Sequence, residues 1–269
     1  MLTKKFFRRI LLLLLLFVPR CAAGDWRGTV LAVLDGDTVV VRGEDGKEET
    51  VRYLYIDTPE LHHPRRREEE LGPEAREANR DLVEGRGVRL ITDAVPRDRY
   101  GRLLARVVVD TPRGPVDVGT ELVRRGLALP LFIPPNSGGR EDIHRALEEA
   151  RREGRGWWGR ARGRIFSCAQ LWAEFSLVAG SFCVLTLRVD EVEERPTRWI
   201  LRERGSRIPV ILPRDFFPSP RSLLGRTLRA WGKAVPSFSG GEMPVADPLQ
   251  IEVVDNAPPS PEFFPEVWP

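Results

Sequence analysis

The chain has 269 residues, of which 42% are apolar and 30% are charged. This balance is that of a soluble globular protein with one large domain or two ordinary ones, and it excludes wholesale disorder and a polytopic membrane protein. The formal net charge is +3, but the first 23 residues carry five basic side chains and no acidic one, so the remainder stands at −2. Any binding of nucleic acid must therefore depend on local placement of arginine and not on bulk charge.

The N-terminus has the three-part layout of an export signal. A basic segment, residues 1–9, precedes the apolar run 10–18, and the small residues 21–23 follow. The apolar run is too short to span a bilayer comfortably. We therefore predict a signal peptide over residues 1–23, and lipid attachment at Cys21 is the less favoured alternative.

Residues 24–163 combine strand and helix patterns. β-branched runs between turn signals predict strands over residues 26–33, 38–41, 50–56, 88–92 and 103–109. Helix start and stop signals predict helices over residues 72–85, 116–125 and 141–153. We expect one compact unit of strands and helices from this order.

The candidate chemistry lies in three short stretches of this unit, residues 35–38, 52–60 and 98–102. They supply carboxylates that hold a hard cation, two arginines suited to a phosphate, and Glu60, which can take a proton from water. Phosphodiester hydrolysis requires such parts, because charge builds on the phosphorus. Plainer roles stay open, since Arg52 can pair with an acid inside a barrel and Arg102 can be a solvated loop residue.

The three stretches stand in the order, and with nearly the spacing, found in staphylococcal nuclease and its relatives. The chain resembles this family from about Trp26 to Trp158, including the helix start at residues 72–75 and the stretch 122–128. The resemblance implies a mainly β fold with α-helices, an OB-type five-stranded barrel plus three helices. It also implies cleavage of DNA and RNA to leave 3′-phosphates.

The resemblance assigns a role to each candidate. Asp37 and Asp57 match the carboxylates that bind calcium, with the backbone carbonyl of Thr58 as a third ligand and Asp35 supporting them without touching the metal. The residues that act on the phosphodiester are the arginine clamp, Arg52 and Arg102, and the general base for water, Glu60.

Further residues match the family's nucleotide pocket, namely Arg99, Tyr100 and Leu104. Phe132 stands where well-studied members have a tyrosine, so stacking on a base can survive while a hydroxyl contact is lost. Gly119 stands where the family often has asparagine, which removes a structural hydrogen bond.

Residues 164–255 show a different pattern, with strand-like segments and no helix of comparable length. The stretch 224–232, followed by 248–253, resembles the final strands of OB-fold binding domains, so we predict a second small β-barrel of OB type. Such barrels stack single-stranded bases on exposed aromatic side chains. The candidates are Trp199, Phe216, Phe217 and Trp231, each of which instead fills the barrel or the domain junction in the plainer interpretation.

Two cysteines, Cys168 and Cys183, remain after signal cleavage. An even count in an exported chain predicts a disulfide. The proline-rich residues 256–269 are predicted to form an untethered tail.

These patterns predict an exported, calcium-dependent nuclease that hydrolyses DNA and RNA in the periplasm, outside the cell or at the cell envelope. We expect a monomer with no stable membrane insertion after signal cleavage. The alternative is a non-catalytic protein that uses the same barrel to bind nucleic acid or an envelope partner. Barrels of this family that no longer catalyse are expected to lack some of the acids or arginines at these positions. All five candidate residues are present here, namely Asp37, Arg52, Asp57, Glu60 and Arg102.

Overall fold

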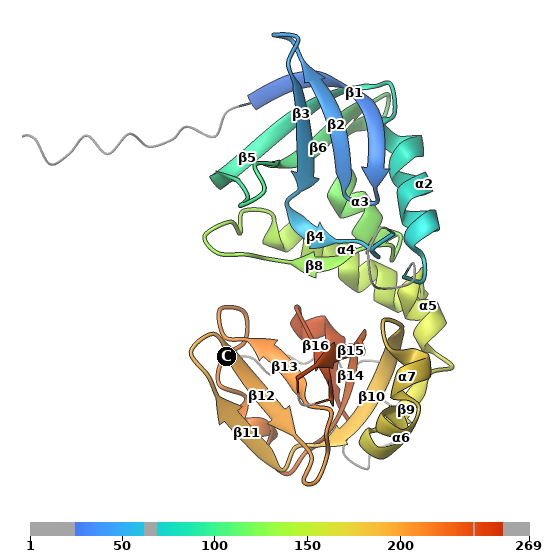
Figure 1. Ribbon diagram of the computed structural model, residues 1–269, viewed down its shortest axis with the longest axis vertical. Coiled ribbons are helices and arrows are strands. Elements are labelled where there is room, and N and C mark those ends of the chain that lie inside the picture. Colours follow the sequence, from blue (N-terminus) through green and yellow to red (C-terminus); the bar gives the residue numbers. More distant parts are fainter. Residues whose placement is uncertain (1–24, 62–68, 239, 255–269) are drawn as a thin grey trace, which may run out of the picture.

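The computed structural model describes residues 25–61, 69–238 and 240–254. The predicted signal peptide and proline-rich tail lie outside these ranges. Within them, no helix is long and apolar enough to cross a membrane. The chain forms two parts, an upper one over residues 25–161 and a lower one over residues 165–253, each built around a hydrophobic core (Figure 1).

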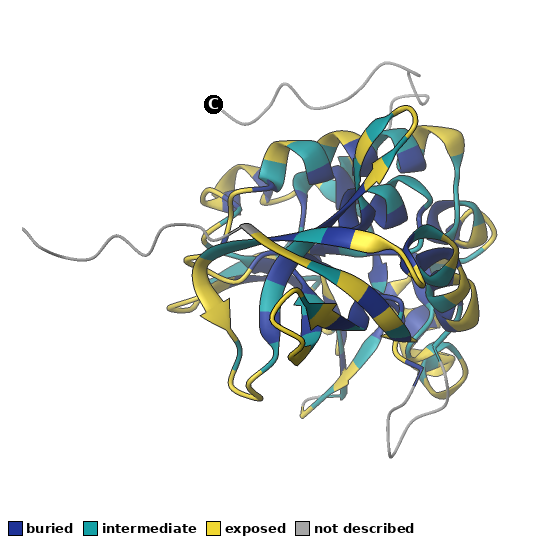
Figure 2. Ribbon diagram, turned by 90° about the horizontal axis from the view of Figure 1, so that it is seen from above, coloured by how far each residue is buried: buried dark blue, intermediate teal, exposed yellow. Residues whose placement is uncertain are grey.

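The upper part contains a closed five-stranded barrel, which confirms the predicted fold class. Its strands are β1 (Asp25–Asp35), β2 (Thr38–Gly43), β3 (Glu48–Tyr53), β5 (Gly87–Arg97) and β6 (Leu103–Thr111). They follow the order β3-β2-β1-β5-β6, and a parallel pairing of β3 with β6 closes the ring. Inward valines and leucines of these strands fill the barrel. Figure 2 shows buried and exposed positions along the same strands.

Helices and two short strands complete the upper part. The helices are α2 (Gly72–Val83), α3 (Val118–Arg124), α4 (Arg140–Glu153) and the short α5 (Trp157–Ala161). The helix predicted from residue 116 begins at Val118, because residues 116 and 117 belong to β7 (Gly114–Asp117), which pairs with β6. β4 (Tyr55–Asp57) pairs with β8 (Leu129–Leu131) below the barrel.

The lower part is made of two sheets with strand orders β17-β14-β10-β9 and β11-β12-β13-β16-β15. The strands are β9 (Ile165–Ser167), β10 (Phe182–Arg188), β11 (Glu191–Glu194), β12 (Arg198–Arg202), β13 (Val210–Pro213), β14 (Thr227–Lys233), β15 (Val235–Ser237), β16 (Gly240–Pro244) and β17 (Ile251–Val253). Two short helices, α6 (Cys168–Ala173) and α7 (Phe175–Val178), cover one side. That this part is an OB barrel stays a prediction.

The predicted disulfide between Cys168 and Cys183 was wrong, because both are free cysteines. Each side chain packs in the apolar core of the lower part. Burial raises the pKa of Cys168 to about 11 and that of Cys183 to about 12, so both thiols stay protonated at neutral pH. An even number of cysteines does not determine where the chain places their side chains.

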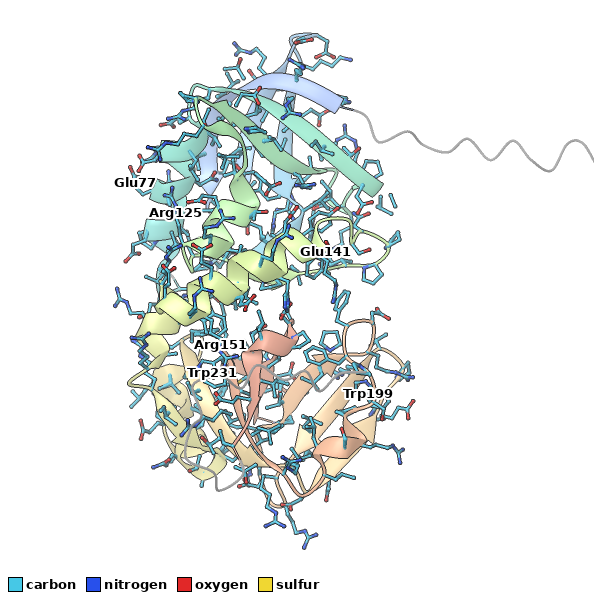
Figure 3. The ribbon with its side chains drawn as sticks, turned by 180° about the vertical axis from the view of Figure 1, so that it is seen from behind. Glu77, Arg125, Glu141, Arg151, Trp199 and Trp231 are labelled. Atoms are coloured by element: carbon cyan, nitrogen blue, oxygen red, sulfur yellow. The ribbon has the colours of Figure 1, made fainter. Side chains whose placement is uncertain are left out.

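The two parts meet through aromatic and charged contacts. Trp157 of α5 stacks on Phe182 of β10 with ring centroids 5.3 Å apart. The guanidinium of Arg151, on α4, lies 4.4 Å from the ring centroid of Trp231, on β14, and Figure 3 labels both. α4, a helix of the upper part, therefore also contacts the lower part.

Candidate active site

The β1–β2 turn places Asp37 against the segment that follows β4. The side chain is buried, and its Oδ2 accepts hydrogen bonds from the backbone N–H and the hydroxyl of Thr58, each at 2.9 Å. Its Oδ1 accepts one from the Thr38 hydroxyl at 3.1 Å. A Cβ on Gly36 would lie 2.7 Å from Thr58 Oγ1, so only glycine allows the turn to approach this closely.

Asn79 of α2 holds the same turn from the opposite side. Its Nδ2 donates to the carbonyl of Asp35 at 3.0 Å, and its Oδ1 accepts from the Tyr53 hydroxyl at 2.8 Å. The Asp35 carboxylate accepts from the N–H of Gly36 at 2.7 Å, so it stabilises the turn next to Asp37. Sequence reasoning missed Asn79, although a polar residue on the apolar face of a predicted helix signals a buried partner.

Arg52 joins the two candidate metal carboxylates. Its Nη2 lies 2.9 Å from Asp57 Oδ1 and 3.1 Å from Asp37 Oδ2. Its Nη1 donates to the carbonyls of Tyr53 and Ile56, both at 2.8 Å. The plainer role, pairing with acids, is thus present, and it brings the arginine to the carboxylates that the resemblance assigns to calcium.

The oxygens around Arg52 fit a hard divalent cation. The Asp37 and Asp57 oxygens that share Nη2 lie at most about 6 Å apart, and calcium binds oxygen at about 2.3–2.6 Å, so a small shift lets one ion contact both. The surrounding protein partly desolvates the half-exposed Asp57 carboxyl group and so raises its pKa, although the charges of Lys233 and Arg52 oppose this. Among the described residues no group of three or more acidic, histidine or cysteine side chains is placed to hold a metal ion, so backbone oxygen and water would have to complete a ligand set built on Asp37 and Asp57.

Glu60 lies three residues beyond Asp57 and is exposed. Its backbone is held, since its N–H donates to Glu69 Oε2 at 3.2 Å and its carbonyl accepts from the N–H of Glu69 at 2.9 Å. Lys233, from the lower part, contacts the same Glu69 carboxylate. Sequence reasoning missed both Glu69 and Lys233, because their meeting depends on how the two parts pack.

Arg102 and its neighbours lie at the end of β6 that faces Arg52. Arg52 and Leu104 are register partners in the parallel β3–β6 pair, and Arg102 directly precedes β6, two residues before Leu104. Within the described residues, the Arg102 guanidinium pairs with Asp98, with Nε 2.7 Å from Oδ2. Tyr100 is 68% exposed, and the Arg99 guanidinium lies 4.8 Å from its ring centroid.

Phe132 is not exposed beside Arg99 and Tyr100. It is buried, its ring stacks on Tyr55 at 5.7 Å, and Phe216 from the lower part meets its edge at 5.5 Å. The Arg140 guanidinium covers both phenylalanine rings, at 5.0 and 4.2 Å from their centroids. The lower part therefore occupies the place where a base was expected to stack on Phe132, and we leave this residue out of the proposed substrate contacts.

The aromatic candidates of the lower part follow the plainer interpretation. Trp199 and Phe217 are buried, and the Trp199 indole donates to the Phe217 carbonyl at 3.1 Å. Phe216 and Trp231 pack at the junction against Phe132 and Arg151. These side chains are therefore not a free stacking surface for single strands.

The closed barrel thus brings Arg52 together with the carboxylates of Asp37 and Asp57, a combination that suits the chemistry of phosphodiesters. Residues 50–160 match the family model described as staphylococcal nuclease homologue. The thermonuclease of Staphylococcus intermedius is 35% identical over 131 residues, which cover 49% of this chain and 75% of the relative. That of Staphylococcus hyicus is 34% identical over 129 residues, covering 48% and 73%.

Endonuclease YncB of Bacillus subtilis (strain 168) is 34% identical over 135 residues, covering 49% of this chain and 62% of the relative. The chain belongs to the staphylococcal nuclease family and is a hydrolytic nuclease. The family likeness accounts for about half of the chain.

Proposed function

We propose that the protein is an exported, calcium-dependent nuclease that hydrolyses phosphodiester bonds of both DNA and RNA. The observation that carries this proposal is the contact of one arginine, Arg52, with both Asp37 and Asp57. Such a site can hold a cation and a phosphate side by side if the two carboxylates turn to the metal, because the Nη2 group that they now contact is then released to donate to a phosphate oxygen.

Each chain residue has a distinct task in this proposal. Asp37, Asp57 and the Thr58 carbonyl would hold calcium, and Asp35 supports the turn that carries Asp37. When bound, calcium supplies positive charge that stabilises the phosphorane-like transition state. The clamp residues Arg52 and Arg102 neutralise the phosphate oxygens, where each positioned donor is worth about 3 kcal/mol in the transition state.

Glu60 would take the proton from the attacking water. Its side chain is exposed, so a water molecule can reach the carboxylate. Arg99, Tyr100 and Leu104 would line the path of the nucleotide beside the clamp, where the Tyr100 side chain is exposed.

The test is digestion of plasmid DNA and of single-stranded RNA with calcium or with excess chelator. We expect both substrates to be cut with calcium and neither with chelator. Glu60→Gln should lower turnover by about a hundredfold or more, whereas the matched change Glu44→Gln, at an exposed hairpin position, should leave it unchanged. Binding of nucleic acid without cleavage would favour the alternative, a non-catalytic binding protein, and full cleavage in chelator would refute the calcium requirement.

Export belongs to the same proposal and rests on the sequence of residues 1–23. We expect a mature protein that begins at Gly24, is monomeric and is not stably inserted in the membrane. N-terminal sequencing of the purified protein and light scattering check these points, and a mature chain that begins with a lipid-modified Cys21 would contradict them.

A further inference from the structure

Lys233 is the one lysine of the described residues that lies at the junction of the two parts. The chain has only four lysines, and Lys47 is far more exposed, with 77% of its side chain open against 13% for Lys233. Lys233 ends β14, where its ammonium lies 2.5 Å from Glu69 Oε2 and 4.7 Å from the ring centroid of Trp157. A charge buried this far persists only where its partner is well placed.

Glu69 links Lys233 to the backbone of Glu60. The same Glu69 Oε2 that meets Lys233 also accepts the N–H of Glu60 at 3.2 Å. The backbone adds a second link, from the N–H of Glu69 to the carbonyl of Glu60 at 2.9 Å. Lys233, Glu69 and Glu60 therefore form one continuous chain of polar contacts from the lower part to the proposed general base.

The lower part is anchored well enough to transmit this restraint. Lys233 is the register partner of Phe182 in the β10–β14 pair, and Phe182 stacks on Trp157 and meets the edge of Trp158. Next to Glu69, the carboxylate of Glu70 accepts from Arg164 Nη2 at 3.0 Å. Residues 69 and 70 are thus held from two directions, by β14 and by the segment that leads into β9.

We propose that Lys233 is a positioning residue of the nuclease, which acts through Glu69 to fix the backbone of Glu60 and so sets where the base meets the attacking water. This inference rests on the proposed function. It makes the lower part a component of the active site and not only an attached module. Since the restraint acts on the base, its loss should slow the chemical step rather than weaken the binding of nucleic acid, and a misplacement of about 1 Å can cost on the order of a hundredfold in rate.

The experiment compares single substitutions in the full chain, with calcium and a defined oligonucleotide. Lys233→Met keeps most of the length of the side chain but removes its charge, and we expect kcat to fall at least tenfold with KM changed less than twofold. Lys233→Arg, which can still reach Glu69, should recover most of the loss. Lys47→Met is the matched control, because Lys47 is exposed and pairs with the exposed Asp45 at 3.4 Å, and it should behave as the wild type.

A double variant separates positioning from a general loss of structure. In the Glu60→Gln background, Lys233→Met should lower kcat less than twofold further, because the residue through which it acts is already gone. Glu69→Gln removes the ion pair from the other side, leaves Lys233 in place and should reproduce the loss in kcat, which keeps the test decisive if Lys233→Met fails to fold.

Three results would overturn the inference: unchanged kcat in both Lys233→Met and Glu69→Gln, a loss confined to KM, or an equal loss with and without Glu60. If the wild type itself does not cleave, the proposed function fails first and the inference falls with it. Cleavage by the wild type with full activity of both variants defeats the inference alone.

Discussion

Replacement of the two clamp arginines by methionine should separate stability from catalysis. From the sequence, we expect loss of either arginine to lower turnover far more than stability. The structure changes this expectation for Arg52, which is 13% exposed and bonds to two carboxylates and two backbone carbonyls. Arg102 is 33% exposed, and its ion pair is with Asp98.

The magnitudes follow from these contacts. Breaking a buried ion pair costs about 3–5 kcal/mol, and Asp37 is the buried partner of Arg52. The contact with Asp57 adds little, since that side chain is 48% exposed, while the two carbonyls add about 1 kcal/mol each. We therefore expect Arg52→Met to lose about 5 kcal/mol of stability and Arg102→Met about 1 kcal/mol or less.

The assay measures urea unfolding by tryptophan fluorescence and turnover at a temperature where every variant is folded. Both variants should lose at least about a hundredfold in kcat, because each removes a donor that faces the charge of the transition state. Arg42→Met is the matched control, since Arg42 is 54% exposed and pairs only with Glu48 on the neighbouring strand. A stability of Arg52→Met within about 1 kcal/mol of the wild type would refute the network described here, and wild-type turnover in folded Arg102→Met would refute its place in the clamp.

Two further predictions concern buried partners. The hydrogen bond from His144 to Asp247, at 3.2 Å, raises the pKa of His144, so its contribution to stability is complete below the unfolded pKa of about 6.5 and disappears as pH rises through the higher folded pKa. The Tm of the wild type should fall over this interval more than that of His144→Asn, and equal slopes would contradict this. Asn79→Leu should cost about 2–4 kcal/mol in urea unfolding, because the Tyr53 hydroxyl and the Asp35 carbonyl lose their partner. A loss under about 1 kcal/mol would show that water replaces the amide.

Local signals predicted most of the upper part correctly. Pro73 in the first turn of α2 and Gly85 after its end mark that helix because these residues suit helix termini. The strand predicted over residues 50–56 is broken at Leu54 in the structure, and Tyr55, the first residue of β4, adopts a left-handed conformation with φ of 69°. The break lets the Tyr53 and Ile56 carbonyls converge on Arg52, so a deviation from the regular pattern marks the site itself.

Features that depend on packing between distant segments were not predictable in this way. The place of Phe132 in the chain predicts a ring that is free to stack on a base, yet Phe216, more than eighty residues away, covers it. The two cysteines likewise read as a pair, but each enters the apolar core as a free thiol. In both cases the decisive contacts lie in the lower part, whose short strands and helices give weak periodic signals.

The junction explains why the aromatic residues of the lower part are poor candidates for base stacking. Trp231 lies under Arg151, Phe216 packs against both Phe132 and Arg140, and Phe182 stacks on Trp157. Rings used in this way join the two cores, and they cannot leave the junction to bind a single strand without separating the parts. The same junction brings Lys233 to Glu69, so under the proposed role of Lys233 the aromatic packing helps to hold Glu60 in place. The aromatic rings of the lower part cannot both hold the junction together and stack on nucleic acid. Their burial therefore favours the proposed role, in which the lower part positions Glu60.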